Sequence, residues 1–194
     1  MKFWRYAVIV ASALLSACSS LAPVSKDHTV VSANDVLQRN GRFAVLVVDK
    51  TQDKNSDSVQ GNFSWTSKGQ NVLLDLSSPL GQILARVEVT ANGARLTRSN
   101  GEVLEAWSPD ELIEEVLGRQ FPVSGLRYWI RGQAMPDFPL EQAEYDEQQR
   151  LTQFQQAGWK VTLQEYDTHG PKRFHLLNNQ TTERITIRIV INDE

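Results

Sequence analysis

The sequence is poor in the residues from which disulfides and many metal sites are built. It contains one cysteine, Cys18, and three histidines. A single cysteine excludes an internal disulfide and any metal site that needs two thiolates of this chain. Lysine and arginine never occur more than two in a row, and the formal net charge is −3. A surface for binding nucleic acid is therefore not expected.

Familiar catalytic motifs are also absent from the sequence. There is no Gly-x-Ser-x-Gly nucleophile elbow, no phosphate-binding loop and no dinucleotide fingerprint. His169 and His175 flank a proline turn without a third ligand nearby, and His28 lies far from them in the sequence. We therefore interpret these histidines as residues of loops and strand faces rather than as zinc ligands. We therefore expect neither catalysis nor a cofactor.

The N-terminal segment has the features of a targeting signal. Lys2 and Arg5 precede an apolar stretch, residues 7–15, that is too short to cross a bilayer as a helix. Residues 15–18, Leu-Ser-Ala-Cys, resemble the lipobox of bacterial lipoproteins. The resemblance implies cleavage before Cys18 and lipidation of that cysteine, which would give a stable membrane anchor. The alternative is an ordinary signal peptide followed by a chance cysteine.

The chain as a whole has the composition of one globular domain. Of its 194 residues, 41% are hydrophobic and 22% are charged, which is ordinary for such a domain. We expect a signal peptide at 1–17, a lipidated tether at 18–30 and a single domain at 31–194. In many lipoproteins an aspartate after the cysteine retains the protein in the inner membrane. Ser19 therefore implies delivery to the outer membrane, with the domain facing the periplasm.

The stretch 72–90 has the pattern of two strands joined by a sharp turn. Pro79 and Gly81 are turn formers, and Leu80 stands between them. Two interpretations of Leu80 stay open: it folds back over the hairpin, or it points outward at an apolar partner. Apolar residues alternate along the two strands: Val72, Leu74 and Leu76 before the turn, and Ile83, Ala85, Val87 and Val89 after it.

Antiparallel strands are predicted on both sides of this hairpin. Residues 41–48 and 59–66 alternate as strands do, and the polar stretch 49–58 is predicted as a loop. Asn-Gly pairs at 92–93 and 100–101 are strong hairpin signals, so 41–106 is predicted as a meander of about six strands. Later strands are predicted at 151–155, 159–163, 174–177 and 184–191, with a turn at Asn178-Asn179.

Helices are predicted between these two groups of strands. Residues 108–111, Ser-Pro-Asp-Glu, form a capping box, and Gly118 ends the helix that they begin. A second short helix is predicted at about 125–131, and another at 31–38. The acidic residues of the first helix are interpreted as solvent-facing groups that favour the helix dipole rather than as catalytic carboxylates: Asp110, Glu111, Glu114 and Glu115.

The expected fold is mainly β, of the α+β kind, with about ten or eleven antiparallel strands and two or three helices. A curved sheet with helices across its mouth can enclose an apolar cavity. A filled core would use the same alternating residues, so the pattern alone leaves both interiors open.

Five short stretches, taken in order, resemble the LolB family of outer-membrane lipoproteins. They are 41–45 (Gly-Arg-Phe-Ala-Val), 63–65 (Phe-Ser-Trp), 73–81 (ending Ser-Pro-Leu-Gly), 126–132 (Leu-Arg-Tyr-Trp-Ile-Arg-Gly) and 158–161 (Gly-Trp-Lys-Val). The likeness runs over most of the chain that follows the signal peptide. It departs in one place, because members often carry a tryptophan in the first mature helix and residues 21–40 have none.

The resemblance implies a fold, a ligand and partners. The fold is an unclosed β-barrel with helices as a lid over an apolar cavity. The cavity would bind acyl chains of lipoproteins handed over by a LolA-type periplasmic carrier, and the protein would insert them into the outer membrane without nucleotide hydrolysis. It would act as a monomer held on the inner leaflet by lipid on Cys18. The residues expected to line the cavity are Phe43, Phe63, Trp65, Leu74, Leu76, Ile83, Val87, Leu112, Val116 and Trp129.

In this family the leucine of the Pro-Leu-Gly loop protrudes and serves membrane insertion. Here that loop is Pro79, Leu80 and Gly81, so the resemblance favours the outward orientation of Leu80. A competing hypothesis is a structural outer-membrane lipoprotein that scaffolds an envelope assembly complex and binds no lipid in its domain. A periplasmic hydrolase is the least favoured, because no nucleophile and base can be named.

Overall fold

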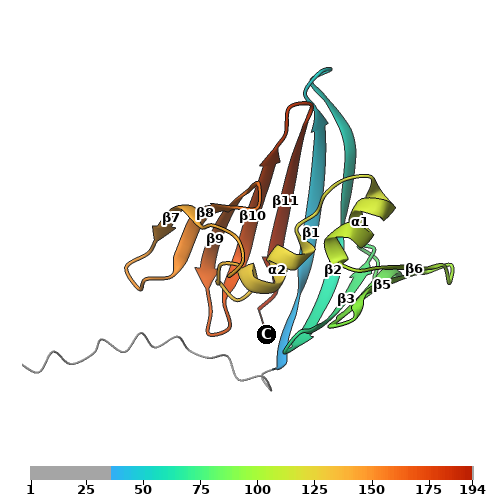
Figure 1. The fold of residues 1–194 in the computed structure, drawn as a ribbon, viewed down its shortest axis with the longest axis horizontal. Helices are drawn as coiled ribbons and strands as arrows, with labels where there is room; N and C mark the ends of the chain where they lie inside the picture. Colours follow the sequence, from blue (N-terminus) through green and yellow to red (C-terminus); the bar gives the residue numbers. More distant parts are fainter. Residues whose placement is uncertain (1–35, 194) are drawn as a thin grey trace, which may run out of the picture. The chain divides into compact units, whose positions relative to one another are not determined.

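The computed structural model describes residues 36–193, which form one antiparallel sheet and two helices (Figure 1). The sheet contains eleven strands in the order β6-β5-β4-β3-β2-β1-β11-β10-β9-β8-β7, and β6 and β7 are its two free edges. This is the expected mainly β, unclosed arrangement. The strands are β1 (Val36–Asp49), β2 (Lys54–Lys68), β3 (Asn71–Ser77), β4 (Ile83–Thr90), β5 (Gly93–Arg98), β6 (Val103–Ala106), β7 (Glu141–Tyr145), β8 (Leu151–Gln156), β9 (Trp159–Tyr166), β10 (Pro171–Asn179) and β11 (Glu183–Ile191).

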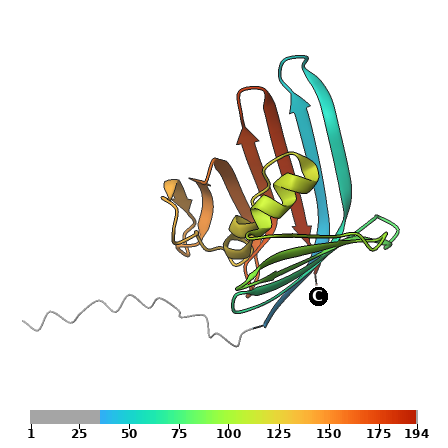
Figure 2. The same ribbon diagram turned by 45° about the vertical axis from the view of Figure 1, so that its right-hand side comes forward.

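Both helices lie on the concave side of the curved sheet (Figure 2). Helix α1 (Pro109–Leu117) begins where the sequence predicted, with the Ser108 hydroxyl accepting from the backbone N–H of Glu111 at 3.1 Å. It ends at Gly118, whose φ of 66° is the left-handed conformation that glycine adopts readily. Helix α2 (Val123–Trp129) begins two residues before the predicted start. Among the described residues, neither helix is long and apolar enough to span a membrane.

Three sequence predictions about strand limits were wrong. Residues 36–38, predicted as part of a helix, belong to β1, while the rest of 31–38 lies outside the described residues. The predicted loop 49–58 is mostly strand, because β1 and β2 pair as far as Asp49 and Lys54. The predicted Asn178-Asn179 turn lies within β10, and Asn178 pairs with Ile185 of β11. In each case cross-strand pairing sets the structure where the local pattern gave another signal.

The sequence did not reveal β7 at all. Its residues are mostly exposed, Gln142 has a positive φ of 50°, and the pairing with β8 is interrupted twice. An edge strand of this kind buries little, so it leaves almost no period of two in the sequence.

Two glycine–phenylalanine pairs lie opposite each other on the paired strands β1 and β2. Gly41 pairs with Phe63, and Phe43 pairs with Gly61. A methyl group at Gly41 would overlap the carbonyl oxygen of Val190, and one at Gly61 would overlap that of Ser77. Each phenylalanine ring lies against the glycine opposite it. Since only glycine permits this close approach, the two pairs allow neighbouring strands to pack tightly where the sheet curves.

The buried side chains form two clusters. The larger core lies between β1–β3, β8–β11 and α2, and Trp129, Phe154 and Leu176 are among its fully buried members. The smaller core lies between β4, β5, α1 and the first residue of α2, and it is made of Val87, Ala94, Leu96, Leu112, Ile113 and Val123. Leu74, Val89 and Phe121 pack against both clusters.

Buried polar groups attach α2 to the larger core. The side-chain oxygen of Gln156, on β8, accepts from the Trp129 indole N–H at 3.1 Å and from the Met135 backbone N–H at 2.9 Å. Its amide nitrogen donates to the carbonyl oxygens of Met135 and Phe138, both at 3.0 Å. Gln156 therefore fixes the end of α2 and the connection that follows it to the sheet.

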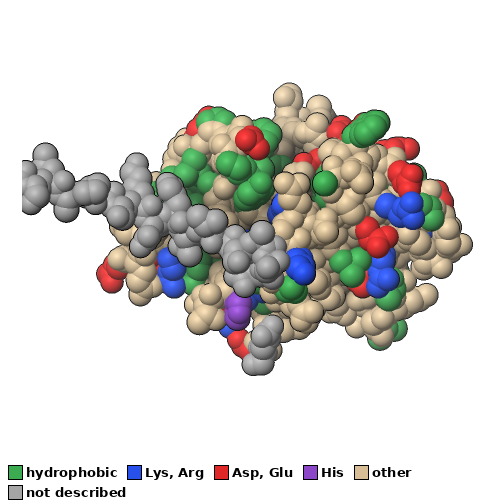
Figure 3. Space-filling model, turned by 60° about the horizontal axis from the view of Figure 1, so that its bottom comes forward, with side chains coloured by type: hydrophobic (Ala, Val, Ile, Leu, Met, Phe, Trp, Pro, Cys, Tyr) green, Lys and Arg blue, Asp and Glu red, His purple; other side chains and the backbone are tan. Residues whose placement is uncertain are grey.

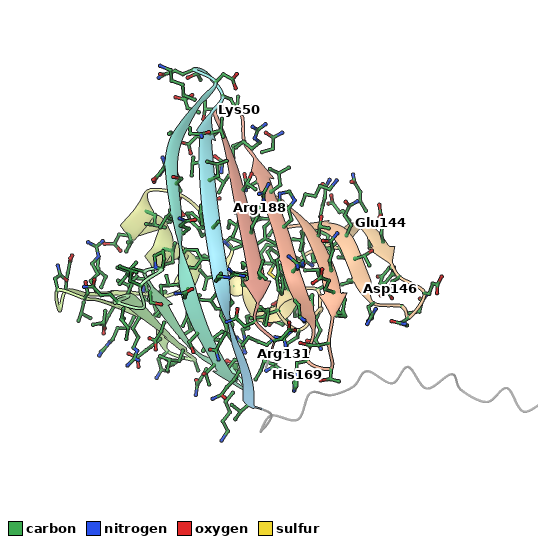
Figure 4. All side chains as sticks on the ribbon, turned by 180° about the vertical axis from the view of Figure 1, so that it is seen from behind. Lys50, Arg131, Glu144, Asp146, His169 and Arg188 are labelled. Carbon is green, nitrogen blue, oxygen red and sulfur yellow. The ribbon has the colours of Figure 1, made fainter. Side chains whose placement is uncertain are left out.

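Two further polar contacts hold opposite ends of the sheet. At one end Arg39, 3% exposed, donates to the Asp167 carboxylate at 2.7 Å and to the Pro171 carbonyl at 2.9 Å. At the other end the Lys50 ammonium donates to the Gln180 carbonyl at 2.8 Å, joining the tips of two hairpins. Figure 4 shows Lys50 at the end of the sheet opposite Arg131 and His169.

Candidate functional site

A cavity of about 250 Å³ lies between the concave face of the sheet and the two helices. One wall comes from β1–β4, β10 and β11, and the other from α1, α2 and the residues that join them. Its lining residues are Phe43, Val45, Val59, Phe63, Trp65, Leu74, Leu76, Leu84, Ala85, Val87, Ile113, Leu117, Phe121, Pro122, Val123, Leu126, Ile130, Phe174, Ile187 and Ile189.

The chemistry of this lining is uniform. Every side chain is apolar, and no acidic, basic or amide side chain is among them. Only Trp65 carries a hydrogen-bonding atom, its indole N–H. Such a surface binds hydrocarbon by removing it from water, and it has no group that could act as an acid, a base or a nucleophile.

The cavity reaches the surface at exposed hydrophobic residues. Val59, Leu84 and Leu117 line it and are each more than a third exposed. On the face shown in Figure 3, hydrophobic side chains (green) also gather in groups at the surface. Large apolar side chains that stay in contact with water are a feature of binding surfaces, so the rim suits the entry of an apolar ligand.

The structure brings six of the ten predicted lining residues to the cavity: Phe43, Phe63, Trp65, Leu74, Leu76 and Val87. The other four lie elsewhere, and in each case the next residue along the chain lines the cavity instead. Ile83, Leu112, Val116 and Trp129 are replaced by Leu84, Ile113, Leu117 and Ile130.

These four differences have two physical causes. The ladder between β3 and β4 shifts at Leu76 and Ser77, so Ile83 is displaced from the inward face and is half exposed. On the helices the apolar stripe is wide enough to serve two surfaces. Leu112 and Trp129 are completely buried in the two cores, and their neighbours on the stripe face the cavity.

Several lining residues were not named from the sequence. Ile187 and Ile189 come from β11, whose alternating isoleucines were recognised as a strand but not assigned to the cavity. Their alternation could have assigned them to the cavity, because β11 pairs directly with β1, which also lines it. Phe121 and Pro122 lie in the irregular connection between the helices, for which no periodic pattern exists.

The turn between β3 and β4 presents Leu80 to the solvent. The backbone N–H of Gly81 donates to the Ser78 carbonyl at 2.9 Å, and that of Ser78 donates to the Gln82 carbonyl at 2.8 Å. Gly81 has a φ of 88°, which a glycine adopts without strain. Leu80 is 98% exposed, so it does not fold back over the hairpin. A well-bonded turn thus holds a large apolar side chain in water.

Charged groups near this hairpin lie on its outer face. Arg86 of β4 donates to both carboxylate oxygens of Asp75 on β3, at 2.6 and 2.8 Å. The hydrogen bond from Arg86 lowers the pKa of Asp75 below its ordinary value, against a smaller opposing effect of burial. Among the described residues no group of three or more potential metal ligands lies together. His169 lies in the β9–β10 turn and His175 on an exposed face of β10.

Comparison with known proteins identifies the family. A family model described as outer membrane lipoprotein LolB matches residues 36–193. The chain is similar to the outer-membrane lipoprotein LolB of Bordetella petrii, with 38% identity over 93% of this chain and 87% of that protein. This chain belongs to the LolB family. LolB of Bordetella pertussis is 42% identical over 82% of this chain and 79% of its own length. LolB of Cupriavidus necator is 38% identical over 92% and 90%.

Membership of the LolB family gives the cavity and the loop their context. It assigns the chain a role in lipoprotein localisation at the outer membrane, and not an enzymatic one. The residues that line the cavity and form the Leu80 turn lie within the part matched by the LolB model. Cys18 and the predicted signal peptide and tether lie outside the described residues.

Proposed function

We propose that this protein accepts lipoproteins by binding their acyl chains in the apolar cavity and then inserts them into the outer membrane. A LolA-type periplasmic carrier would deliver them. The protein itself would be a monomer, anchored to the inner leaflet by lipid on Cys18. The single observation that carries the proposal is the cavity, lined by twenty apolar residues between the sheet and two helices.

The energetics favour a passive transfer. Burying one methylene contributes about 0.8 kcal/mol, so ten of them contribute about 8 kcal/mol. An acyl chain therefore cannot cross water unescorted at a useful rate. Movement from one apolar cavity to another, and then to a bilayer, exchanges similar environments. Only a modest difference in affinity is needed at each step, and no nucleotide has to be hydrolysed.

The size of the cavity bears on how a chain would enter. Its volume of about 250 Å³ is slightly below the range of about 300–1,000 Å³ usual for small-molecule sites. It therefore holds part of one chain, and a lipoprotein with several chains requires the helices and the sheet to separate further. Leu117 of α1 and Leu84 of β4 border the opening, so separation there would enlarge the cavity directly.

Binding can be tested with a variant that fills the cavity. Ala85 lines the cavity, whereas Ala91 lies in an exposed turn. In the full chain carrying Cys18→Ala, which prevents lipid attachment, we expect saturable displacement of a fluorescent fatty acid. Ala85→Phe should weaken it at least about tenfold, a loss of about 1.4 kcal/mol, and Ala91→Phe should not. Absence of saturable binding in the parent protein would contradict the proposal and favour the scaffold hypothesis.

The loop of Pro79, Leu80 and Gly81 has a separate part in the proposal. Leu80 would enter the bilayer when cargo is delivered, because its side chain is already held in water by the turn. We expect Leu80→Glu to fold and to bind acyl chains as before, but to deliver lipoproteins into outer-membrane vesicles at least about tenfold more slowly, since a carboxylate resists entry into hydrocarbon. Leu80→Met is the matched apolar control. Full insertion by Leu80→Glu would show that the loop does not act in this way.

A further inference from the structure

The convex face of the sheet, on the side away from the two helices, carries a block of residues that includes cations but no acid (Figure 4, with Arg188 labelled). In β9, β10, β11, β1 and β2, residues that line the cavity or the larger core alternate with residues of the opposite face. Three outward positions on each of these five strands make a block of fifteen, and none is aspartate or glutamate. The fifteen residues are Lys160, Thr162, Gln164, Arg173, His175, Leu177, Thr186, Arg188, Val190, Arg42, Ala44, Leu46, Ser58, Gln60 and Asn62.

Most of the charged side chains in this block have no carboxylate partner. Arg42, Lys160 and Arg188 are exposed and form no ion pair with a residue that the structure describes. Arg173 pairs with Glu165 at 2.6 Å. Arg42 and Arg188 are diagonal neighbours across β1 and β11, at about 7–8 Å. We call Arg42, Lys160, Arg173, His175 and Arg188 the basic patch.

Arginines on β4 and β5 are arranged differently. Arg86 of β4 pairs with Asp75 of β3 at 2.6 Å, and Arg95 of β5 pairs with Glu105 of β6 at 2.6 Å. The chain as a whole has a formal net charge of −3. Uncompensated positive charge is therefore a local property of the basic patch and not of the protein surface in general.

His175 shows the electrostatics inside the patch. It lies opposite Arg188 of β11 and diagonal to Lys160 of β9. Burial lowers the pKa of His175, and the positive charges of Arg188 and Lys160 lower it further, while no carboxylate of the described residues raises it. The field at this face is thus positive, which favours an anionic partner.

We propose that the basic patch binds the anionic phospholipid surface of the outer membrane. The LolB family places the protein at that membrane, so a layer of lipid phosphates is an anionic surface always close to it. Binding through this face leaves the helix side of the sheet free (Figure 2). The inference does not depend on what the cavity holds.

The shape of the face suits a layer of head groups better than one small anion. The patch spans four adjacent strands, β9, β10, β11 and β1, which is about 14 Å across. Because the face is convex, its side chains point away from one another and cannot converge on a single phosphate, but each can meet a separate head group. One lysine or arginine near an anionic bilayer strengthens binding by about fivefold.

The tests use the compact unit of residues 32–194. It contains the whole sheet, both helices and both buried clusters, so it can fold by itself. Residues 1–31 are omitted because Lys2, Arg5 and the apolar stretch 7–15 would themselves bind anionic vesicles.

The first experiment measures binding to vesicles by cosedimentation. We expect the parent unit to bind vesicles of phosphatidylglycerol and phosphatidylcholine in equal amounts, and to bind phosphatidylcholine alone much more weakly. Arg42→Gln together with Arg188→Gln should weaken binding to the mixed vesicles at least about tenfold. The matched control is Lys54→Gln together with Lys68→Gln, which removes the same charge from exposed positions at the two ends of β2 and should have a much smaller effect.

The second experiment locates the face that meets the membrane and keeps every charge of the patch. Residues 32–194 contain no cysteine, so a single introduced cysteine can carry a fluorescent label. Gln60→Cys places it in the block on the convex face, and Gln120→Cys places it in the exposed connection between the helices. A nitroxide-labelled phospholipid in the mixed vesicles should quench the label at position 60 several-fold more than the label at position 120.

Three results would overturn the inference. They are no preference of the parent unit for phosphatidylglycerol, equal loss of binding in the two double variants, and stronger quenching at position 120 than at position 60. If the unit ignores the vesicles but binds polyglutamate through Arg42 and Arg188, the partner is an acidic protein and not the membrane. Fatty-acid displacement should be the same in all these variants, because the patch and the cavity lie on opposite faces of the sheet. Failure of this inference therefore leaves the proposed function standing.

Discussion

The two cores hold their helices by different means. The larger core fixes α2 through the buried side chain of Gln156, which bonds Trp129. Nearer the surface, Arg127 of α2 donates to the Gly69 carbonyl at 3.0 Å, and Arg131, just after α2, donates to the Ser67 hydroxyl at 3.2 Å. The smaller core holds α1 by apolar packing. The buried polar residues of the described part of the chain are Arg39, Ser67, Gln156 and Asn178, and none belongs to β4, β5 or α1.

The polar contacts on the α1 side are few and lie nearer the surface. The Asp110 carboxylate accepts from the Ser124 backbone N–H at 2.9 Å, which joins α1 to the start of α2. Arg119, just after α1, pairs with Glu183 at 3.3 Å and with Asp57 at 3.5 Å. Hydrogen bonds need one geometry, whereas apolar contact tolerates sliding. Of the two helices, α1 is therefore the one that can shift without breaking a buried polar network.

The largest predicted effect breaks the polar attachment of α2. Gln156→Ala leaves the Trp129 indole N–H and the Met135 backbone N–H buried without an acceptor. We expect a loss of about 3 kcal/mol in the free energy of unfolding, measured by urea denaturation. Gln155→Ala removes only a hydrogen bond to Gln142 near the surface and should cost about 0.5 kcal/mol or less. Equal effects of the two substitutions would show that Gln156 has no special role.

The next effect concerns the ion pair between Arg39 and Asp167 and the pH dependence of its contribution to stability. Burial raises the pKa of Asp167, but hydrogen bonds from Arg39, His169 and Gly170 outweigh it, so the pKa lies below its ordinary value of 3.8. A lowered carboxylate pKa in the folded state stabilises the protein above pH 3.8, and this stabilisation is lost as the pH falls through the folded pKa.

Asp167→Asn should therefore lower stability by about 2 kcal/mol at neutral pH, since Arg39 is buried and its partner is partly exposed. As the pH falls from 3.8 through the lower folded pKa of Asp167, the difference between the variant and the parent should shrink. Urea denaturation at pH 7 and at pH 3 measures both quantities. A difference that stays constant down to pH 3 would mean that Asp167 does not act through its charge.

A smaller effect is expected at the contact between the helices. Asp110→Ala frees the backbone N–H of Ser124 and should destabilise the protein by about 1 kcal/mol. Because α1 has the weaker polar attachment, its amides should exchange with solvent faster than those of α2, and the substitution should widen that gap. Hydrogen exchange read by mass spectrometry measures this, with Glu114→Ala on the exposed side of α1 as control. Faster exchange of α2 than of α1 in the parent protein would reverse the comparison.

The smallest effect belongs to Arg119. Its two ion pairs are long and partly solvated, so Arg119→Met should change the free energy of unfolding by about 0.5 kcal/mol. The change should shrink further in high salt, because screening weakens exposed pairs. A loss comparable to that of Gln156→Ala would place a strong polar attachment on the α1 side and remove the contrast between the cores.

Local signals in the sequence were sufficient for much of this fold. Turn residues such as Asn92-Gly93 and the cap at Ser108 determine nearby backbone conformation, so the meander and α1 were predicted closely. Strand limits beyond the core were not, because pairing between β1 and β2 extends into polar residues that carry no alternation.

Each of the ten residues expected to line the cavity lies at or next to a lining position, but half of the twenty lining residues were neither expected there nor next to an expected one. Alternation identified the inward faces of β1–β4, but a bulge near Ser77 moved Leu84 into the place expected for Ile83. Gln156 could not have been found, because a glutamine in a strand is usually a surface residue and its partners come from distant segments. The exposure of Leu80 needed the structure as well, since the same Pro-Leu-Gly turn permits a side chain folded back.

The free edges at β6 and β7 have a mechanical consequence. A closed cylinder of strands has a circumference set by its ladder, so a wider interior would require broken backbone hydrogen bonds. A sheet with two open ends has no such constraint. Small changes of twist, shared among eleven strands, can change the width of its concave side while the hydrogen bonds between strands stay intact. The same sheet can thus accommodate ligands of different sizes by bending elastically.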